Sequence, residues 1–277
     1  MSKTWLITGA DKGLGYSAAE TALKRGDNVV VTVLASDGRH PLSETFPERF
    51  RSFHLNAADV ARVPEVVAQA EAAFGRIDVL VNNAGYGLIS LIEETPPEKY
   101  RALFDVNFFG LAEITRAVLP IMRRQRSGHI INLSSVAGFG AVAGFGFYSA
   151  TKYAVEGLSE SLAHEVGPLG IKVTIIEPGP FRSDFAGGSL DALISDNEDY
   201  AAAAEYVRTY QTSKHGKQPN DPAKFGPALC KLVDATEPPL RLPLGVEAVA
   251  HLRNEMAQVE GELQMWYELA SSTSFSS

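Results

Sequence analysis

The stretch WLITGADKGLG, residues 5–15, decides how this chain is expected to fold. Its first four residues indicate a short buried strand, and a helical pattern follows the stretch to about Arg25. Between them stand Gly9, Gly13 and Gly15, in the spacing Gly-x-x-x-Gly-x-Gly. Glycines let a backbone approach a pyrophosphate closely, and a helix N-terminus favours negative charge. The stretch therefore predicts a nucleotide-binding turn, although the motif alone could also be a plain glycine turn.

Hydrophobic strands and helical patterns alternate along the rest of the chain. Further strands are expected at about 28–34, 50–55, 77–81, 129–134, 171–177 and 240–244, and helices at about 59–74, 96–125, 148–166, 198–213 and 221–235. The pattern predicts an α/β fold, a Rossmann-like doubly wound parallel sheet of about seven strands flanked by helices. A single NAD(P)-binding domain would span residues 1–277, with a substrate lid inserted at 185–222 and an extra C-terminal helix at 245–270.

Composition narrows the class of protein. The chain has 277 residues, 45% hydrophobic and 21% charged, which is typical of a soluble globular protein. A formal charge of −8 argues against nucleic-acid and membrane partners. The single cysteine, Cys230, excludes an intramolecular disulfide and a cysteine-cluster metal site, and no metal is predicted. Without a signal-peptide pattern or a run of eighteen apolar residues, a cytoplasmic location is expected.

A tyrosine and a lysine one helical turn apart suggest proton-transfer chemistry. Tyr148 and Lys152 are four residues apart, which places them on one face of the predicted helix. A nearby cation favours the phenolate, so Lys152 is expected to pull the pKa of Tyr148 down from about 10. Ser135 follows the fifth predicted strand, at the sheet edge where open α/β folds hold ligands. A hydroxyl donor beside a tunable phenol suits proton transfer to or from a carbonyl oxygen.

The end of the second predicted strand bears on the choice of cofactor. An acidic residue there would select NAD, but the chain continues with Leu34 and Ser36 and has no acid until Asp37. Lys12, Ser36 and Arg39 could hold a 2′-phosphate, so NADP(H) is preferred and NAD(H) remains possible. The alternative is that Lys12 and Arg39 are ordinary solvated surface charges.

With these stretches in place, the chain resembles the short-chain dehydrogenase/reductase family, in its compact single-domain branch. Four motifs carry the resemblance: Thr8 to Gly15, Asn82 to Gly85, Ser135 with Tyr148 and Lys152, and Pro178-Gly179 after the sixth strand. They span about residues 4–184 in the family's order and spacing. Residues 185–277 carry no function that the resemblance transfers.

The resemblance implies roles for the catalytic side chains. Tyr148 would be the acid in carbonyl reduction and the base in alcohol oxidation, and Ser135 would hydrogen-bond the substrate oxygen. Lys152 would bind the nicotinamide ribose and lower the pKa of Tyr148. Asn107, inside the long helix, would hold a water on the proton relay behind the lysine; from the residues alone, an amide satisfied by backbone was the alternative.

The resemblance also implies a set of cofactor contacts. They are Gly9, Asp11, Lys12, Gly13, Leu14, Gly15, Leu34, Ser36, Asn56, Ala57, Asn83, Ala84, Gly85, Tyr148, Lys152, Pro178, Gly179, Phe181 and Ser183. Ser183 stands where the family usually has threonine, and Asn56 stands where it commonly has aspartate. No basic residue directly follows the second strand, where NADP-preferring members often have arginine.

The leading hypothesis is an NADP(H)-dependent oxidoreductase that interconverts a ketone and a secondary alcohol on a hydrophobic small molecule. Phe139, Phe145, Phe147, Phe181 and Phe185 suggest an apolar pocket, although several of these rings could be simple core. The alternatives are an NAD-dependent alcohol dehydrogenase, an enzyme that isomerises or dehydrates its substrate, and a non-catalytic cofactor-sensing protein. A pure sensor would not need the catalytic side chains.

The C-terminal segment predicts an amphipathic helix. Apolar residues repeat at helical spacing at Val249, Leu252, Met256, Val259, Leu263 and Trp266. The favoured interpretation packs this face on the same domain, and the alternative makes it a contact between subunits. The family resemblance implies a homo-oligomer, a dimer or a tetramer, built on the helices at 98–125 and 148–166.

Overall fold

The computed structural model describes residues 2–213 and 216–275. Its centre is a seven-stranded sheet in the order β3-β2-β1-β4-β6-β7-β9, in which every neighbouring pair is parallel. The strands are β1 (Thr4–Thr8), β2 (Asn28–Val33), β3 (Phe50–His54), β4 (Val79–Asn82), β6 (Gly128–Leu133), β7 (Ile171–Pro178) and β9 (Arg241–Leu244). The predicted fold class is confirmed, with strand ends within about two residues of those expected.

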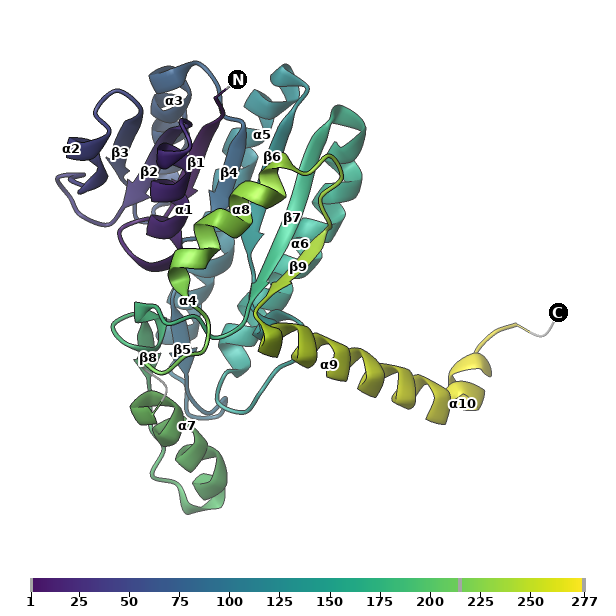
Figure 1. Cartoon of the computed structure of the whole chain (residues 1–277). Coiled ribbons are helices and arrows are strands. Elements are labelled where there is room, and N and C mark those ends of the chain that lie inside the picture. Colours follow the sequence, from purple (N-terminus) through teal and green to yellow (C-terminus); the bar gives the residue numbers. More distant parts are fainter. Residues whose placement is uncertain (1, 214–215, 276–277) are drawn as a thin grey trace.

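Helices cover both faces of this sheet (Figure 1). One face carries α1 (Gly13–Lys24) and α8 (Phe225–Asp234), and the other carries α3 (Val63–Phe74), α5 (Leu111–Gln125) and α6 (Gly146–Val166). Because side chains alternate along a strand, β1 supplies both cores: Trp5 and Ile7 pack towards α1 and α8, and Leu6 packs towards α3, α5 and α6. Chain order reverses between β1 and β4, where such folds bind ligands.

Short elements join these layers. They are α2 (Leu42–Thr45), η1 (Val60–Arg62), η3 (Val136–Gly138), η4 (Gly167–Leu169), η5 (Asp184–Ala186), η6 (Glu198–Tyr200) and η7 (Pro222–Lys224). The predicted helix at 96–125 forms as α4 (Pro97–Phe104), a π-helical turn η2 (Asp105–Gly110) and α5. Among the described residues, no helix is both long and apolar enough to cross a membrane.

The predicted lid segment, residues 185–222, is more regular than its sequence indicates. β8 (Leu190–Ala192) pairs in parallel with β5 (Gly87–Ile89) in a small second sheet. The helical patch expected at 198–213 forms as η6 followed by α7 (Ala201–Ser213). Val207 of α7 is fully buried against Ile89, Phe145 and Tyr148. The segment is therefore packed over the carboxyl ends of the strands.

The C-terminal helix projects from the molecule as an arm (Figure 1). α9 (Val246–Met265) is followed by α10 (Tyr267–Ser271), and only Ala248 and Leu252 of these helices are buried. Every described residue from 256 to 275 is exposed. The favoured sequence interpretation, a helix packed on its own domain, is wrong for this outer half, because the helix leaves the body after its first two turns.

Candidate active site

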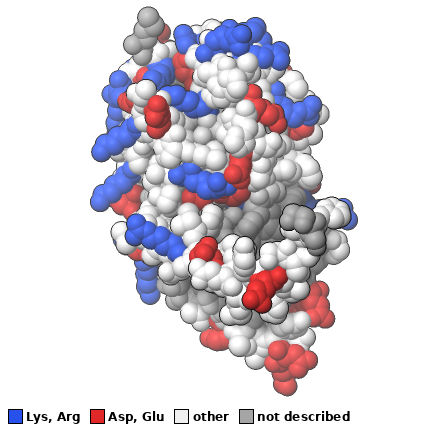
Figure 2. Space-filling view, turned by 90° about the vertical axis from the view of Figure 1, so that its right-hand side faces the viewer, with Lys and Arg blue, Asp and Glu red and all other residues white. Residues whose placement is uncertain are grey.

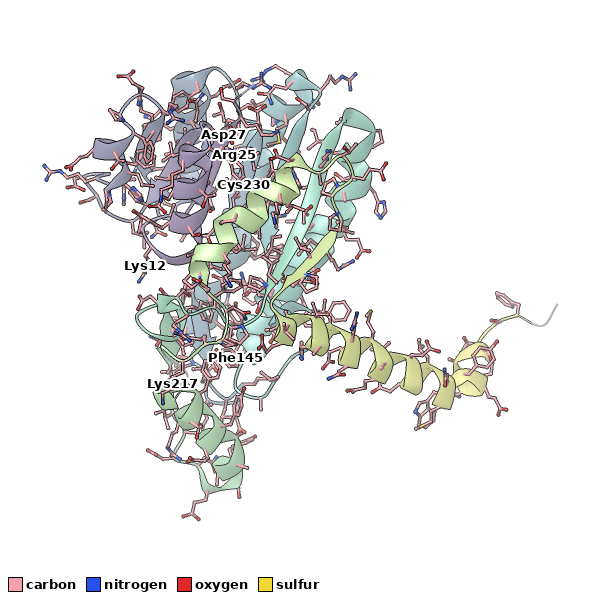
Figure 3. All side chains as sticks on the ribbon, in the orientation of Figure 1. Lys12, Arg25, Asp27, Phe145, Lys217 and Cys230 are labelled. Carbon is pink, nitrogen blue, oxygen red and sulfur yellow. The ribbon has the colours of Figure 1, made fainter. Side chains whose placement is uncertain are left out.

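A cavity of about 1120 Å³ opens at the carboxyl ends of β1, β4, β6 and β7. The glycine turn after β1 forms one end of it, and the lid segment with the base of α9 forms the other. Figure 3 labels Lys12, in the glycine turn, and Phe145, which lines the cavity directly before α6. The volume exceeds what a drug-sized ligand needs, so the cavity has room for a long cofactor and a substrate together.

The glycine turn is built for close approach. Gly9 has φ +62°, and a Cβ at this position would lie 2.8 Å from the Cα of Ala84. The Asn83 side-chain amide donates to the carbonyl oxygens of Thr8 (2.9 Å) and Gly9 (2.7 Å). In return, the Thr8 hydroxyl accepts from the backbone nitrogens of Asn83 and Ala84, both at 3.0 Å. The motifs Thr8 to Gly15 and Asn82 to Gly85 are thus held against each other beside the N-terminus of α1. This arrangement suits the binding of a dinucleotide phosphate.

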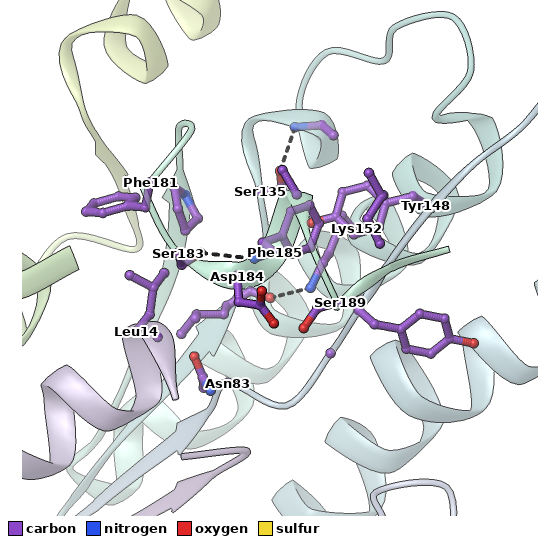
Figure 4. A pocket seen from close by; sticks show the side chains of 18 of the residues that line it. Leu14, Asn83, Ser135, Tyr148, Lys152, Phe181, Ser183, Asp184, Phe185 and Ser189 are labelled. Atoms are coloured by element: carbon purple, nitrogen blue, oxygen red, sulfur yellow. Dashed lines mark hydrogen bonds between the residues drawn. The ribbon is translucent and has the colours of Figure 1, made fainter. Parts of the chain in front are cut away.

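The catalytic candidates meet at the middle of the cavity. Ser135 lies two residues beyond β6, and Tyr148 and Lys152 occupy the first two turns of α6. The Tyr148 ring lies between Phe145 and Phe185, with ring centroids 5.9 and 5.6 Å away. Figure 4 shows Ser135, Tyr148, Lys152 and Phe185 together at the pocket wall, with Leu14 and Asn83 towards the glycine turn.

The pKa of Tyr148 is raised, which is the opposite of the expected shift. Burial is the main cause, and a hydrogen bond with Ser135 only partly offsets it. The Lys152 Nζ donates to the Leu133 carbonyl oxygen at 2.9 Å and lies 5.7 Å from the Tyr148 ring centroid. Burial also lowers the pKa of Lys152 to about 8, against the opposing effect of Glu156. Desolvation by the protein therefore outweighs the attraction that sequence spacing suggested.

The Asn107 side chain does not line the cavity. Its Nδ2 donates to the Tyr86 carbonyl oxygen (2.9 Å), and its Oδ1 accepts from the Tyr86 backbone nitrogen (3.0 Å). A third, longer bond at 3.4 Å goes to the Thr151 hydroxyl. The amide is thus engaged by a distant stretch of backbone. These side-chain contacts position Tyr86 and the neighbouring Gly85, and the role of Asn107 in holding a water stays a prediction.

The adenosine end of the cavity is only partly as expected. Lys12 lines the cavity and forms an ion pair with Asp184. Arg39 pairs with Asp37 at 3.3 Å and is nearly fully exposed, while Ser36 does not line the cavity. The Asp11 carboxylate accepts from the Leu34 backbone nitrogen at 3.3 Å, at the end of β2. Of the three residues predicted to hold a 2′-phosphate, the cavity wall contains only Lys12.

Most of the remaining predicted site residues do line the cavity. They are Gly9, Asp11, Gly13, Leu14, Leu34, Asn56, Ala57, Asn83, Ala84, Gly85, Ser135, Tyr148, Lys152, Pro178, Gly179, Phe181 and Ser183. Gly15 does not; it packs beneath the turn, where a Cβ would lie 2.6 Å from the Asn83 Nδ2. Phe147 also lies outside, stacked on Tyr100 at 4.3 Å. Among the described residues, no group of three or more His, Cys, Asp or Glu side chains could hold a metal ion.

Comparison with known proteins identifies the family. Residues 3–192 match the family model described as short chain dehydrogenase. The chain belongs to the short-chain dehydrogenase family. It is 35% identical over 271 residues to oxidoreductase BOA17 of Botryotinia fuckeliana, covering 98% of each chain. It is 38% identical over 242 residues to a 3-ketodihydrosphingosine reductase of Bacteroides thetaiotaomicron, covering 87% of each.

Solved structures of short-chain dehydrogenases share the fold. One from Streptomyces avermitilis superposes with a TM-score of 0.92 at 40% identity, covering 99% of each chain. A family member from Burkholderia phymatum in complex with NAD gives 0.81 at 23% identity, covering 94% of this chain and 95% of that one. A serine dehydrogenase complexed with NADP+ gives 0.74 at 26%, covering 87% and 94%. The protein is thus an oxidoreductase of CH–OH and C=O groups with a nicotinamide cofactor.

Sequence reasoning missed several residues of this short-chain dehydrogenase cavity. Tyr206 and Tyr210 of α7 line it, as do Tyr86 and, from the base of the arm, His251. The signal for the first two was present: two tyrosines four residues apart in a helical patch share one face. Nothing in the local sequence indicates that the arm's first turn reaches the same cavity.

Proposed function

We propose that this oxidoreductase interconverts a ketone and a secondary alcohol on an apolar small molecule, with Tyr148 as general acid and base. The observation that carries the proposal is a buried phenol, hydrogen-bonded to Ser135, at the wall of a cavity that also contains the glycine turn. The relative named 3-ketodihydrosphingosine reductase supports a ketone substrate by its name.

The proton chemistry follows from the side chains. A phenol whose pKa is raised by burial keeps its proton at neutral pH, so Tyr148 can donate it to a carbonyl oxygen during reduction. The Ser135 hydroxyl lies beside Tyr148 and would hold the same oxygen. When bound, the nicotinamide would exchange a hydride with the carbinol carbon. Lys152, at the cavity wall, would bind the ribose hydroxyls, and Asn107 would position the Tyr86 backbone beside it.

The substrate half of the cavity favours an apolar molecule. Phe145 and Phe185 line it beside Tyr148, and Tyr210 packs edge-on against Phe145 with centroids 4.9 Å apart. Asp191, on the same wall, is paired with Lys99 at 2.7 Å. Aromatic rings and a neutralised carboxylate suit a hydrophobic substrate.

Replacing the phenol tests the mechanism. We expect Tyr148→Phe to lower turnover in a ketone and alcohol screen by at least about 100-fold, the usual range for general acid–base catalysis, with cofactor affinity within a few-fold of wild type. The matched control is Tyr153→Phe, an exposed tyrosine on the same helix whose hydroxyl donates to the Phe139 carbonyl oxygen. Full activity of Tyr148→Phe would show that Tyr148 takes no part in the reaction. A wild-type protein that binds cofactor but turns over none of the ketones and alcohols would support a sensor.

For the cofactor we propose NADP(H), with Lys12 as the contact for the 2′-phosphate. The Lys12–Asp184 ion pair must then open or be shared when the phosphate binds. NAD(H) is the second candidate, because the Asp11 carboxylate at the end of β2 can accept from ribose hydroxyls and repels a phosphate. Titration with NADPH and NADH by nicotinamide fluorescence decides: tighter NADPH binding that Lys12→Ala abolishes supports our proposal, and tighter NADH binding overturns it.

We also propose a homo-oligomer, a dimer or a tetramer, that works in the cytoplasm without nucleic-acid or membrane partners. The arm supports the oligomer because it exposes a row of large apolar side chains. A reducing compartment suits Cys230, a free and buried thiol and the only cysteine of the sequence. Figure 2 shows cationic and acidic side chains mixed over one face, with Asp and Glu at the lower end, an arrangement that does not favour a polyanion.

A further inference from the structure

Two buried carboxyl groups lie behind the catalytic candidates. Glu156 of α6 is 6% exposed, and Glu177, near the end of β7, is completely buried. Arg241 of β9 approaches both: its Nε lies 3.0 Å from the Glu156 Oε2 and 4.0 Å from the Glu177 Oε1. Within the described residues, neither carboxyl oxygen of Glu177 has a hydrogen-bond partner. The three side chains form a polar cluster between α6, β7 and β9.

The cluster holds more acid than its single guanidinium can balance. Arg241 also binds Glu160 at 3.0 Å, an exposed carboxylate on the next turn of α6. Two buried carboxylates close together cannot both stay ionised at low cost, because each loses hydration and repels the other. Glu177 has the poorer partners, and burial followed by the charge of Glu156 raises its pKa to about 7. Burial raises the pKa of Glu156 as well, but its direct hydrogen bond to Arg241 opposes this shift, so Glu156 is the member that keeps its charge as the pH falls.

The charged member lies next to the catalytic lysine. Lys152 and Glu156 are one turn apart on α6, so their side chains share a face. Burial penalises the ammonium of Lys152, and Glu156 is the group that supports it. The other charged or titratable groups around the pair are Tyr148, Tyr153 and Glu160 on α6 and Arg241 on β9; Ser134, next to β6, is uncharged. Glu255 of α9 acts on Tyr153 from further out.

We propose that Glu156 is a positioning residue that keeps Lys152 charged, and that Glu177 is the member of the pair that takes up a proton first, so that protonation of the cluster spares the charge of Glu156. The inference rests on the proposed role of Lys152 at the cofactor. It explains why Glu177, which is fully buried and has no hydrogen-bond partner in the described part of the chain, stands directly before Pro178-Gly179 of the cavity wall.

The test is the pH dependence of cofactor affinity, measured by nicotinamide fluorescence between pH 6 and 10. In wild type we expect affinity to fall as Lys152 loses its proton. Glu156→Gln should move this midpoint to lower pH by about one unit, the size of shift expected when a close opposite charge is removed. Glu177→Gln should leave it nearer to wild type, because Glu156 is the carboxylate that supports Lys152.

Glu160→Gln is the matched control, since Glu160 binds the same arginine but is exposed and one turn further from Lys152. An unshifted midpoint in Glu156→Gln, or an equal shift in Glu160→Gln, overturns the proposal. A wild type that binds neither cofactor at any pH would refute the proposed function instead.

A second measurement needs no cofactor and only one substitution. Because the pKa of Glu177 in the folded protein lies above that of an unfolded glutamate, the folded state keeps a proton that the unfolded chain releases between about pH 4.5 and 7. Wild-type stability should therefore fall as pH rises through this range, and the melting temperature of Glu177→Gln should fall less. Parallel curves for the two proteins would show that Glu177 carries no such proton.

Discussion

In the cofactor turn, both the backbone conformation and the close approach of a neighbouring residue require glycine at position 9. Gly9 and Gly75 both have positive φ, at +62° and +76°, so an alanine at either position is strained by about 1 kcal/mol. Only Gly9 also faces a neighbour, because its added Cβ would meet the Ala84 Cα at 2.8 Å, whereas nothing lies within 4 Å at Gly75. We expect Gly9→Ala to weaken cofactor binding and to lower the melting temperature more than Gly75→Ala. Equal effects on both would show that strain alone is responsible.

For single residues, the sequence predicts which side chains line the site better than it predicts their pKa shifts. The glycine turn, Ser135, Tyr148 and Lys152 could be named because short motifs carry them, and they line one cavity. The direction of the Tyr148 pKa shift could not be predicted, since desolvation depends on surrounding side chains from distant elements. The Glu156–Glu177 pair is invisible for the same reason: only the packing of α6 on β7 brings the two together.

Among the elements, α7 is the one whose role can be tested most directly. Its Tyr210 packs edge-on against Phe145 and lines the cavity, so Tyr210→Ala should remove apolar contact with a bound substrate. We expect KM for an apolar ketone to rise about tenfold, equivalent to about 1.4 kcal/mol, with a smaller change in kcat. Tyr200→Ala is the control from the same segment: its exposed hydroxyl donates to Glu93 outside the cavity. An equal rise in KM for both variants would contradict a substrate contact.

Element prediction succeeded where periodicity is long and failed where it is short. The parallel strands and the helices between them follow from sustained apolar patterns. β5 and β8 have three residues each, too few to show an alternation, and they pair across about one hundred residues. The π-helical turn Asp105–Gly110, inside the long helix, was not predicted either.

For the whole molecule, the sequence gives the amphipathic pattern of the arm but not the surface that it meets. Leu252 packs on the body, and the same helix face continues outward through Met256, Val259 and Leu263, all more than half exposed. A packed helix and a projecting helix have the same apolar repeat, which is why the two could not be distinguished. Figure 3 labels Arg25, Asp27 and Cys230, which lie where α1 meets α8. Arg25 pairs with Asp27 and donates to the Cys230 carbonyl oxygen, although Arg25 and Cys230 are more than 200 residues apart in the chain.

The arm sets the last prediction, which concerns assembly. Met256, Val259, Leu263, Met265, Trp266, Tyr267 and Leu269 are each more than half exposed, and seven such side chains form a patch on the order of several hundred Å². A second copy of the chain is the occupant we propose, since a symmetric pair would cover two such arms and approach the roughly 800 Å² per partner of a stable interface. The arm is also acidic, with Glu255, Glu260, Glu262 and Glu268 against Arg253, which disfavours an anionic lipid surface.

Changing the apolar row should therefore change the mass in solution. By light scattering after gel filtration, we expect wild type to be a dimer or tetramer and Leu263→Glu/Trp266→Glu to have a smaller mass, because two charges enter a desolvated contact. Asn254→Glu/Gln258→Glu adds the same charge on the other side of α9 and should keep the wild-type mass. A monomeric wild type would refute the oligomer, and an unchanged mass in the first variant would move the contact away from the arm, leaving the long helices α5 and α6 as the surface to alter next.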